Sequence, residues 1–147
     1  MGLFQSFNIS ASGMTAERFR TDIIAQNIAN VNSTGNANNE PYRRKIVTFS
    51  EKKVTPFSEY YSHSRNELTG NGVKVSKVTE DYETEFKAEY DPSHPDADEN
   101  GYVSYPNVNI VTEMTNLIDA SRGYEANATA FEASKAIAQA GIQIGKS

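Results

Sequence analysis

The sequence predicts a mainly α protein. Its long N- and C-terminal helices are expected to pair as a coiled coil or bundle, with a small β-rich middle region and a long loop between them. Heptad-spaced apolar residues occupy both ends of the chain, and the middle is poor in them. The 147 residues fit one domain with extended arms. We divide them into an N-terminal helix (1–32), a middle region (33–106) and a C-terminal helix (107–147).

The first helix is predicted over residues 3–31. One heptad seam contains Leu3, Phe7, Met14, Ile24, Ile28 and Val31, with Ser10, Glu17 and Thr21 as polar interruptions. A second seam, two residues out of phase, contains Ile9, Ala16, Phe19 and Ile23. Two offset seams imply contacts with more than one neighbouring helix, as in a bundle or a packed assembly. A helix in an ordinary globular core has the same periodicity.

The middle region contains the signals of short strands. The stretch "NVNSTGNANNEP" ends the helix, since asparagine, glycine and proline all disfavour its continuation. Partial alternation of apolar residues predicts strands at 42–51 and 72–78, and a third near Phe86, Ala88 and Tyr90. The polar segment 52–71 has no period, so it is either a functional loop or disordered until bound.

The C-terminal helix has the stronger pattern. A 4–3 spacing runs through Ile110, Met114, Leu117, Ser121, Tyr124, Ala128, Phe131, Lys135, Ala138 and Ile142. Either Asn107 or Asn109 is expected to cap its first turn. At 1.5 Å per residue the helix is roughly 50 Å long, more than a small globular core covers. The sequence therefore indicates a subunit of an assembly.

Composition excludes several functions. The net charge of −5 argues against nucleic acid as a partner, and we interpret Arg43, Arg44 and Lys45 as a solvated strand end. There is no cysteine, no glycine-rich phosphate loop and no catalytic triad around His63 or His94. We therefore expect no enzymatic activity, no cofactor and no small-molecule substrate. The N-terminus also lacks the layout of a secretory signal peptide.

One segment, residues 96–107, leaves an alternative open. Asp96, Asp98 and Asn100 occupy positions 1, 3 and 5 of a calcium loop, but position 12 is Asn107 rather than a bidentate glutamate. Pro92 and Pro95 also prevent an entering helix. We favour a turn that leads from a strand ending near Tyr90 to an extended piece at 102–105. The alternative is a soluble calcium-binding module.

Two blocks resemble a known family. The stretch "SASGMTAERFRTDIIAQNIANVNSTG" (10–35), which contains Asn27, Asn30 and Asn32, resembles the N-terminal signature of bacterial flagellar rod and hook proteins. The stretch "YDPSHPDADENGYVSYPNVNIVTEMTNLIDASRGYEAN" (90–127), which contains Asn100, Gly101 and Tyr102, is similar to the proximal rod members of that family. Gly123 departs from the pattern, because the family usually has alanine there.

The resemblance implies a structural subunit of the flagellar drive shaft, or rod, which crosses the periplasm. It also implies terminal helices that line the inner tube, and export by the flagellar type III system without a cleaved signal peptide. The implied partners are other rod proteins, further copies of the chain, the adaptor protein FliE and the base of the MS ring. The residues predicted to pack between subunits are Leu3, Phe7, Met14, Phe19, Ile23, Ile24, Ile28, Val31, Ile110, Met114, Leu117, Tyr124, Phe131 and Ile142.

Overall fold

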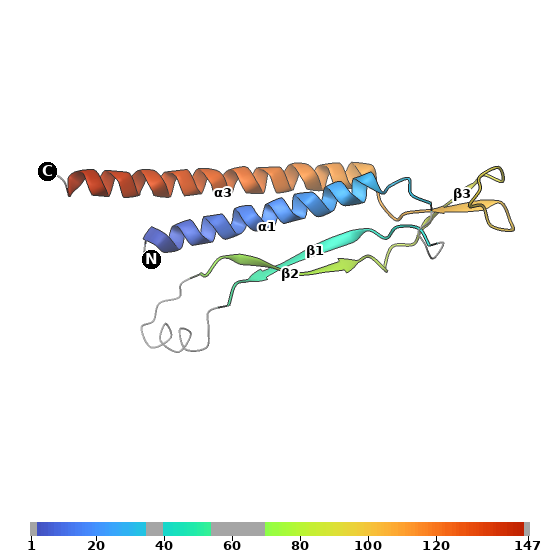
Figure 1. Cartoon of the computed structure of the whole chain (residues 1–147), viewed down its shortest axis with the longest axis horizontal. Coiled ribbons are helices and arrows are strands. Elements are labelled where there is room, and N and C mark those ends of the chain that lie inside the picture. The colour runs from blue at the N-terminus through green and yellow to red at the C-terminus, as the bar shows by residue number, and fades with distance from the viewer. Residues whose placement is uncertain (1–2, 35–39, 54–69, 146–147) are drawn as a thin grey trace. The chain divides into compact units, whose positions relative to one another are not determined.

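The described residues contain two long helices and four short strands (Figure 1). The computed structural model describes residues 3–34, 40–53 and 70–145. The elements are α1 (Leu3–Ala29), β1 (Lys45–Glu51), β2 (Val73–Glu80), β3 (Lys87–Tyr90), β4 (Tyr102–Tyr105) and α3 (Ile110–Ile144). The predicted mainly helical fold with a small β-rich middle is confirmed at this level. Most of the predicted 52–71 loop, residues 54–69, lies outside the described residues.

Asparagine side chains bind main-chain groups at the C-terminal end of α1 and at the N-terminal end of α3. After α1, the Asn30 side chain donates to the carbonyl of Gln26 at 2.8 Å, in addition to the main-chain N–H of Asn30 at 3.2 Å. Before α3, Asn109 Oδ1 accepts from the main-chain N–H groups of Val111 at 3.0 Å and Thr112 at 3.4 Å. Asn109 is therefore the N-cap of α3. Asn107, the other candidate, is used elsewhere.

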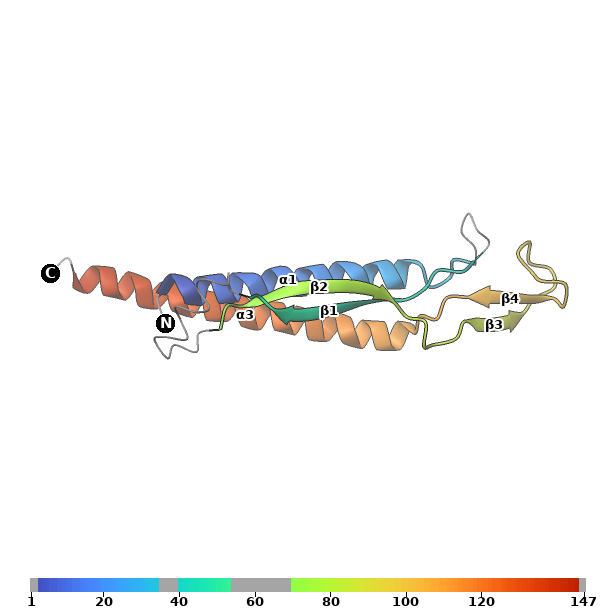
Figure 2. The ribbon, with the colours of Figure 1, turned by 90° about the horizontal axis from the view of Figure 1, so that it is seen from below.

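The strands form two separate two-stranded sheets. β1 pairs with β2, and β3 pairs antiparallel with β4. The register of the second sheet places Lys87 opposite Tyr105 and Tyr90 opposite Tyr102. Figure 2 shows β3 and β4 as a hairpin closed by the turn between them. This hairpin contains the short extended piece that the sequence predicts at 102–105.

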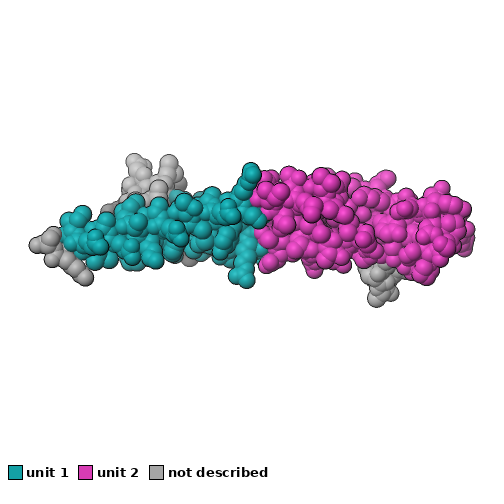
Figure 3. All heavy atoms as spheres, turned by 90° about the horizontal axis from the view of Figure 1, so that it is seen from above, with its two compact units in different colours: residues 1–19, 49–76, 120–147 teal, residues 20–48, 77–119 magenta. Residues whose placement is uncertain are grey.

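The chain divides into two compact units, coloured in Figure 3. Unit 1 comprises residues 1–19, 49–76 and 120–147. In it, the rings of Phe7 and Phe131 pack with their centroids 4.9 Å apart. Gly13 faces the side chain of Asn127, and a Cβ at Gly13 would lie 2.7 Å from Asn127 Cγ. These contacts bring residues of α1 against residues of α3 in reversed sequence order.

Small residues permit this close approach in unit 1. Ala16 and Ala120 are buried, at 3% and 0% exposure. Ser10, counted as a polar interruption of the first seam, is buried as well. Because small side chains occupy the contact, the helix main chains approach closely, and the predicted seam of large apolar residues is only part of the packed surface.

A second set of contacts in unit 1 holds the start of β2. The main-chain N–H of Val73 donates to Ser12 Oγ at 3.0 Å, and Ser12 Oγ donates to the carbonyl of Ile9 at 2.7 Å. The N–H of Lys52 donates to the carbonyl of Gly72 at 2.9 Å. Gly72 has a φ of 86°, and a Cβ there would collide with Ser12 Oγ. Glycine is therefore required at this approach to α1.

Unit 2 comprises residues 20–48 and 77–119. Its buried apolar residues include Ile24, Val103, Pro106 and Val108. Its buried polar residues are Asn27, Asp81, Asn107 and Glu113. The interior of unit 2 is thus as much polar as apolar, and each buried polar group needs a partner.

Candidate functional site

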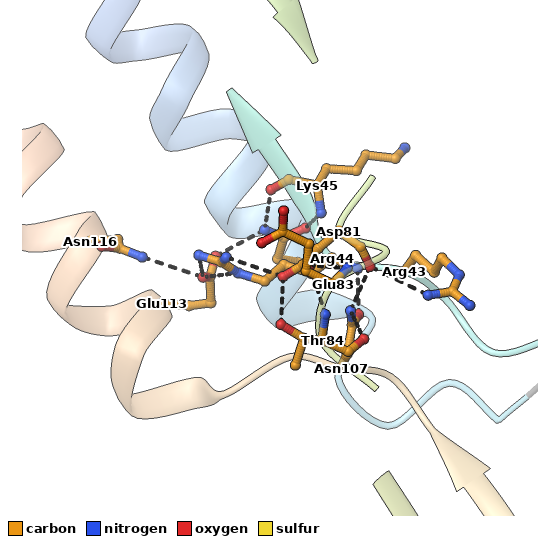
Figure 4. A network of polar contacts seen from close by, with 10 residues as sticks. Arg43, Arg44, Lys45, Asp81, Glu83, Thr84, Asn107, Glu113 and Asn116 are labelled. Carbon is orange, nitrogen blue, oxygen red and sulfur yellow. Dashed lines mark hydrogen bonds and ion pairs between the residues drawn. The ribbon is translucent and has the colours of Figure 1, made fainter. Parts of the chain in front are cut away.

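The polar cluster of unit 2 consists of Asn27 and four residues that Figure 4 labels: Arg44, Asp81, Asn107 and Glu113. Asn27 and Glu113 are only 1% exposed. The five residues come from α1, the segment before β1, the residue after β2, the segment before α3 and the first turn of α3. The cluster therefore ties α1, the start of β1, the end of β2 and the start of α3 together.

The side chain of Asn27 makes four hydrogen bonds. Its Oδ1 accepts from the main-chain N–H of Lys45 and from the Tyr42 hydroxyl, both at 2.9 Å. Its Nδ2 donates to the Lys45 carbonyl and to Glu113 Oε2, again both at 2.9 Å. The amide thus pairs with both main-chain groups of Lys45, as a neighbouring strand would. It fixes the first residue of β1 to α1.

Glu113 and Arg44 form the charged centre of the cluster. Arg44 Nε and Nη2 each lie 2.8 Å from Glu113 Oε1, while Arg44 Nη1 lies 3.7 Å from Asp81 Oδ2. Figure 4 shows the guanidinium between the two carboxylates. Because Asn27 bonds the second oxygen of Glu113, that buried carboxylate is satisfied at both atoms.

Asn107 and Asp81 fix the turn after β2. Asn107 Oδ1 accepts from the N–H of Arg44 at 2.8 Å, and Asn107 Nδ2 donates to the carbonyls of Asp81 and Thr84. Asp81 Oδ1 accepts from the N–H groups of Glu83 and Thr84, both at 3.0 Å. The side chain of Asp81 therefore closes its own turn, as aspartate often does.

Two ionisable groups of unit 2 are shifted by these contacts. The main-chain hydrogen bond from Thr84 lowers the pKa of Asp81, and Thr84 Oγ1, the Glu83 N–H and Arg44 add to this effect against the cost of burial. Burial raises the pKa of Tyr42, and the negative charges of Glu113 and Glu80 raise it further. Both shifts favour the forms present at neutral pH, a charged aspartate and a neutral tyrosine.

The interpretation of Arg43, Arg44 and Lys45 as a solvated strand end is wrong for the two arginines. The guanidinium of Arg43 lies over the rings of Tyr82 and Phe86, at 4.5 and 4.1 Å from their centroids. Arg44 is ion-paired inside the cluster. Basic residues adjacent in sequence point alternately along an extended chain, so each meets a different neighbour.

The turn of the hairpin uses the residues proposed as calcium ligands. Asp98 Oδ1 accepts from the N–H groups of Asn100 at 2.8 Å and Tyr102 at 2.9 Å, and Asp96 Oδ2 accepts from Thr34 Oγ1 at 2.7 Å. Within residues 3–34, 40–53 and 70–145, no group of three or more histidine or acidic residues is placed to hold a metal ion. Asp98 therefore closes the turn, Asp96 binds the Thr34 hydroxyl, and nothing supports the calcium-binding alternative.

The family-signature residues have distinct places. Asn27 lies in the polar cluster, Asn30 follows α1, and Asn32 is exposed just beyond it. Asn100 and Gly101 form the turn, where Gly101 has a φ of 81° and a Cβ would lie 3.0 Å from the Tyr90 ring. The Tyr102 ring packs edge-on against Tyr90 at 5.3 Å. Specific structural demands are therefore seen at Asn27, Gly101 and Tyr102.

The residues predicted to pack between subunits differ in exposure. Ile24 is buried, and Leu3 lies in α1. The half-buried members are Phe7, Met14, Ile23, Ile28, Val31, Leu117 and Phe131. The exposed members are Phe19, Ile110, Met114, Tyr124 and Ile142. Part of the set is therefore used within the chain, and part is available for other contacts.

Sequence reasoning missed Arg44, Asp81, Asn107 and Glu113 as members of a shared site. The one local signal was Asp81 followed three residues later by Thr84, a spacing at which the aspartate accepts main-chain hydrogen bonds. The other contacts join residues far apart in sequence, such as Arg44 and Glu113. No periodicity in the chain reports them.

Comparison with known proteins decides the family. The model described as "Flagella basal body rod protein" matches residues 7–37, and "Flagellar basal body rod FlgEFG protein C-terminal" matches residues 99–144. The chain is 44% identical to the flagellar basal-body rod protein FlgC of Bacillus subtilis (strain 168), over 99% of this chain and 100% of that protein. The chain belongs to the FlgC family.

Other FlgC proteins match over similar lengths. Identity is 39% with FlgC of Borreliella burgdorferi, over 98% of each chain, and 36% with FlgC of Salmonella typhimurium, over 99% of this chain and 100% of that protein. The resemblance to proximal rod proteins is confirmed. As a FlgC family member the chain is a structural subunit of the flagellar basal-body rod. No helix in the described part of the chain is both long and apolar enough to cross a membrane.

Proposed function

We propose that this FlgC family member self-assembles through its terminal helices, and that exposed apolar residues of α3 form the contacts between subunits. The observation that carries this proposal is the exposure of Met114 and Ile142, which are 54% and 61% accessible. Large apolar side chains left open along one helix are typical of interaction surfaces. On α1, the apolar side chain of Phe19 is also exposed, at 39%.

We further infer that α1 and α3 pair as an antiparallel coiled coil. The tilted ring contact between Phe7 and Phe131, and the approach of Gly13 to Asn127, support this pairing in unit 1. The hydrogen bond between Asn27 and Glu113 supports it in unit 2. A buried polar pair of this kind sets the register between helices, because any slip breaks this bond and leaves Glu113 Oε2 unsatisfied.

In the assembled rod, the helices of segments 1–32 and 107–147 are proposed to line the export channel, while segment 33–106 faces outward. A satisfied buried cluster in unit 2 suits a subunit that transmits torque, because it resists displacement of β1 from α1 and α3. The proposed neighbours are other rod proteins, FliE and the base of the MS ring. We propose a location across the periplasm and export without a cleaved signal peptide.

The test separates assembly from folding. Met114 and Ile142 are replaced by glutamine in the chromosomal gene, and Thr129→Gln, at an exposed polar position of α3, is the matched control. The paired replacement is expected to abolish rod assembly and motility, while the purified variant keeps its urea unfolding midpoint because neither side chain is buried. Normal motility of the Met114→Gln/Ile142→Gln strain would remove the proposal.

A further inference from the structure

The chain contains two Asn-Gly pairs, Asn71–Gly72 and Asn100–Gly101, and both lie among the described residues. A glycine after asparagine has no Cβ, so its main-chain nitrogen approaches the asparagine side chain with little steric hindrance. We propose that Asn100 is a site of spontaneous deamidation in the folded protein and that the fold protects Asn71.

The reaction needs no enzyme and no oxidant. The main-chain nitrogen of Gly101 loses its proton to a base and attacks Cγ of Asn100, forming a new N–Cγ bond. The bond from Cγ to the side-chain nitrogen breaks, and that nitrogen leaves as ammonia with the proton. Water then opens the five-membered succinimide. Cleavage at Cγ gives aspartate, and cleavage at the main-chain carbonyl gives isoaspartate.

The surroundings of Asn71–Gly72 oppose this attack. The Gly72 carbonyl accepts from the Lys52 N–H at 2.9 Å, and the next N–H, of Val73, donates to Ser12 Oγ at 3.0 Å. The side chain of Ser12 also fills the space beside Gly72. The main chain is therefore held from both α1 and the end of β1, and several contacts must break together before the ring can close.

The surroundings of Asn100–Gly101 are different. Asn100 is exposed, and its side-chain amide has no hydrogen-bond partner among the described residues. Among the described residues, Gly101 bonds only within the hairpin turn: its N–H donates to the Asp98 carbonyl at 3.0 Å, and its carbonyl accepts from the Asp91 N–H at 3.0 Å. A local opening of this turn frees the attacking nitrogen and leaves the helices and β1–β2 untouched.

The product changes the hairpin in two ways. Either product adds a negative charge beside Asp98 and Glu99, which are already acidic. Isoaspartate also inserts a methylene into the main chain, directly before a glycine that packs closely on the Tyr90 ring. The modification therefore alters charge and register at a turn that carries three family-signature residues.

The experiment uses the purified full chain, incubated at mildly alkaline pH either folded or in urea. Peptides containing each asparagine are measured by mass spectrometry, and isoaspartate is counted with an isoaspartyl methyltransferase. In urea both sites are expected to react. In the folded chain product is expected at Asn100, with Asn71 strongly slowed. Equal rates at the two sites in the folded chain, or an intact Asn100 there, would overturn the proposal.

Two variants sharpen the result. Asn100→Gln is expected to remove the product at position 100, because the corresponding attack forms a less favourable six-membered ring. Ser12→Ala removes the acceptor of the Val73 N–H and is expected to raise the rate at Asn71 in the folded chain about fivefold, the factor equivalent to one typical hydrogen bond. An unchanged rate at Asn71 in Ser12→Ala would refute the assigned cause of protection.

Discussion

Replacement of Asn27 by alanine tests the polar cluster most directly. The change removes four hydrogen bonds, to Tyr42, to both main-chain groups of Lys45 and to Glu113. Glu113 is 1% exposed, so water cannot replace the lost partner of its Oε2. The result is a buried, partly unsatisfied carboxylate next to an empty space.

The expected loss of stability follows from the burial of each partner. An unsatisfied bond to a buried charged group costs about 2–3 kcal/mol. Tyr42 and Lys45 are half-buried, so water recovers part of their bonds, and together they add roughly 1 kcal/mol. The total of about 3–4 kcal/mol is large against a typical unfolding free energy of roughly 5–15 kcal/mol.

The assay is urea unfolding of the full chain, followed by circular dichroism in the helical region. Asn30→Ala is the matched control, because it removes one exposed bond to Gln26 and should cost about 0.5 kcal/mol. In a Glu113→Gln background the cost of Asn27→Ala should fall by about 1 kcal/mol, because glutamine has a single acceptor oxygen, which Arg44 uses, so the bond from Asn27 is already lost. A loss of under about 1 kcal/mol, or one equal to that of Asn30→Ala, would refute the structural role assigned to Asn27.

Alanine at two helical glycines should have opposite effects on the urea midpoint. Gly13→Ala places its Cβ 2.7 Å from Asn127 Cγ, so overpacking of about 1–3 kcal/mol exceeds the gain in helix propensity of roughly 1 kcal/mol, and the midpoint should fall. Gly123→Ala meets only the flexible Glu17 side chain, at 3.1–3.3 Å, so the midpoint should rise; shifts of the same sign would contradict this packing. The main-chain hydrogen bond that lowers the pKa of Asp81 below 3.8 stabilises the fold at pH values above 3.8, and this contribution is lost as the pH falls through the lowered pKa. Asp81→Asn should therefore flatten the acid end of the stability profile in urea titrations at several pH values, and an unchanged profile would argue against this contribution.

The sequence predicts the regular elements well, because their signals are local. The heptad pattern gives α1 within two residues of its end at Ala29, and Asn109 marks the start of α3. The alternation around Phe86, Ala88 and Tyr90 gives β3 at Lys87–Tyr90. Periodicity and capping depend only on neighbours within a few residues, so a single sequence carries them.

The polar cluster was not predictable in the same way. Arg44 and Glu113 are 69 residues apart, and each belongs to a residue type that is usually exposed. Hydrophobic patterning assigns such residues to the surface by default. They become interior groups only when the fold brings the guanidinium, the carboxylate and the Asn27 amide together. Ser10 shows the same effect on a smaller scale, since this polar residue lies buried on a mostly apolar seam.

The guanidinium of Arg44 has a consequence for how related chains are compared. It uses Nε and Nη2 on one carboxylate and directs Nη1 toward another, which requires a planar group with several donors. Lysine preserves the charge but has a single ammonium, which cannot reproduce this forked geometry. An arginine-to-lysine exchange here, though conservative by charge, would mark a relative in which the first turn of α3 is anchored by different chemistry.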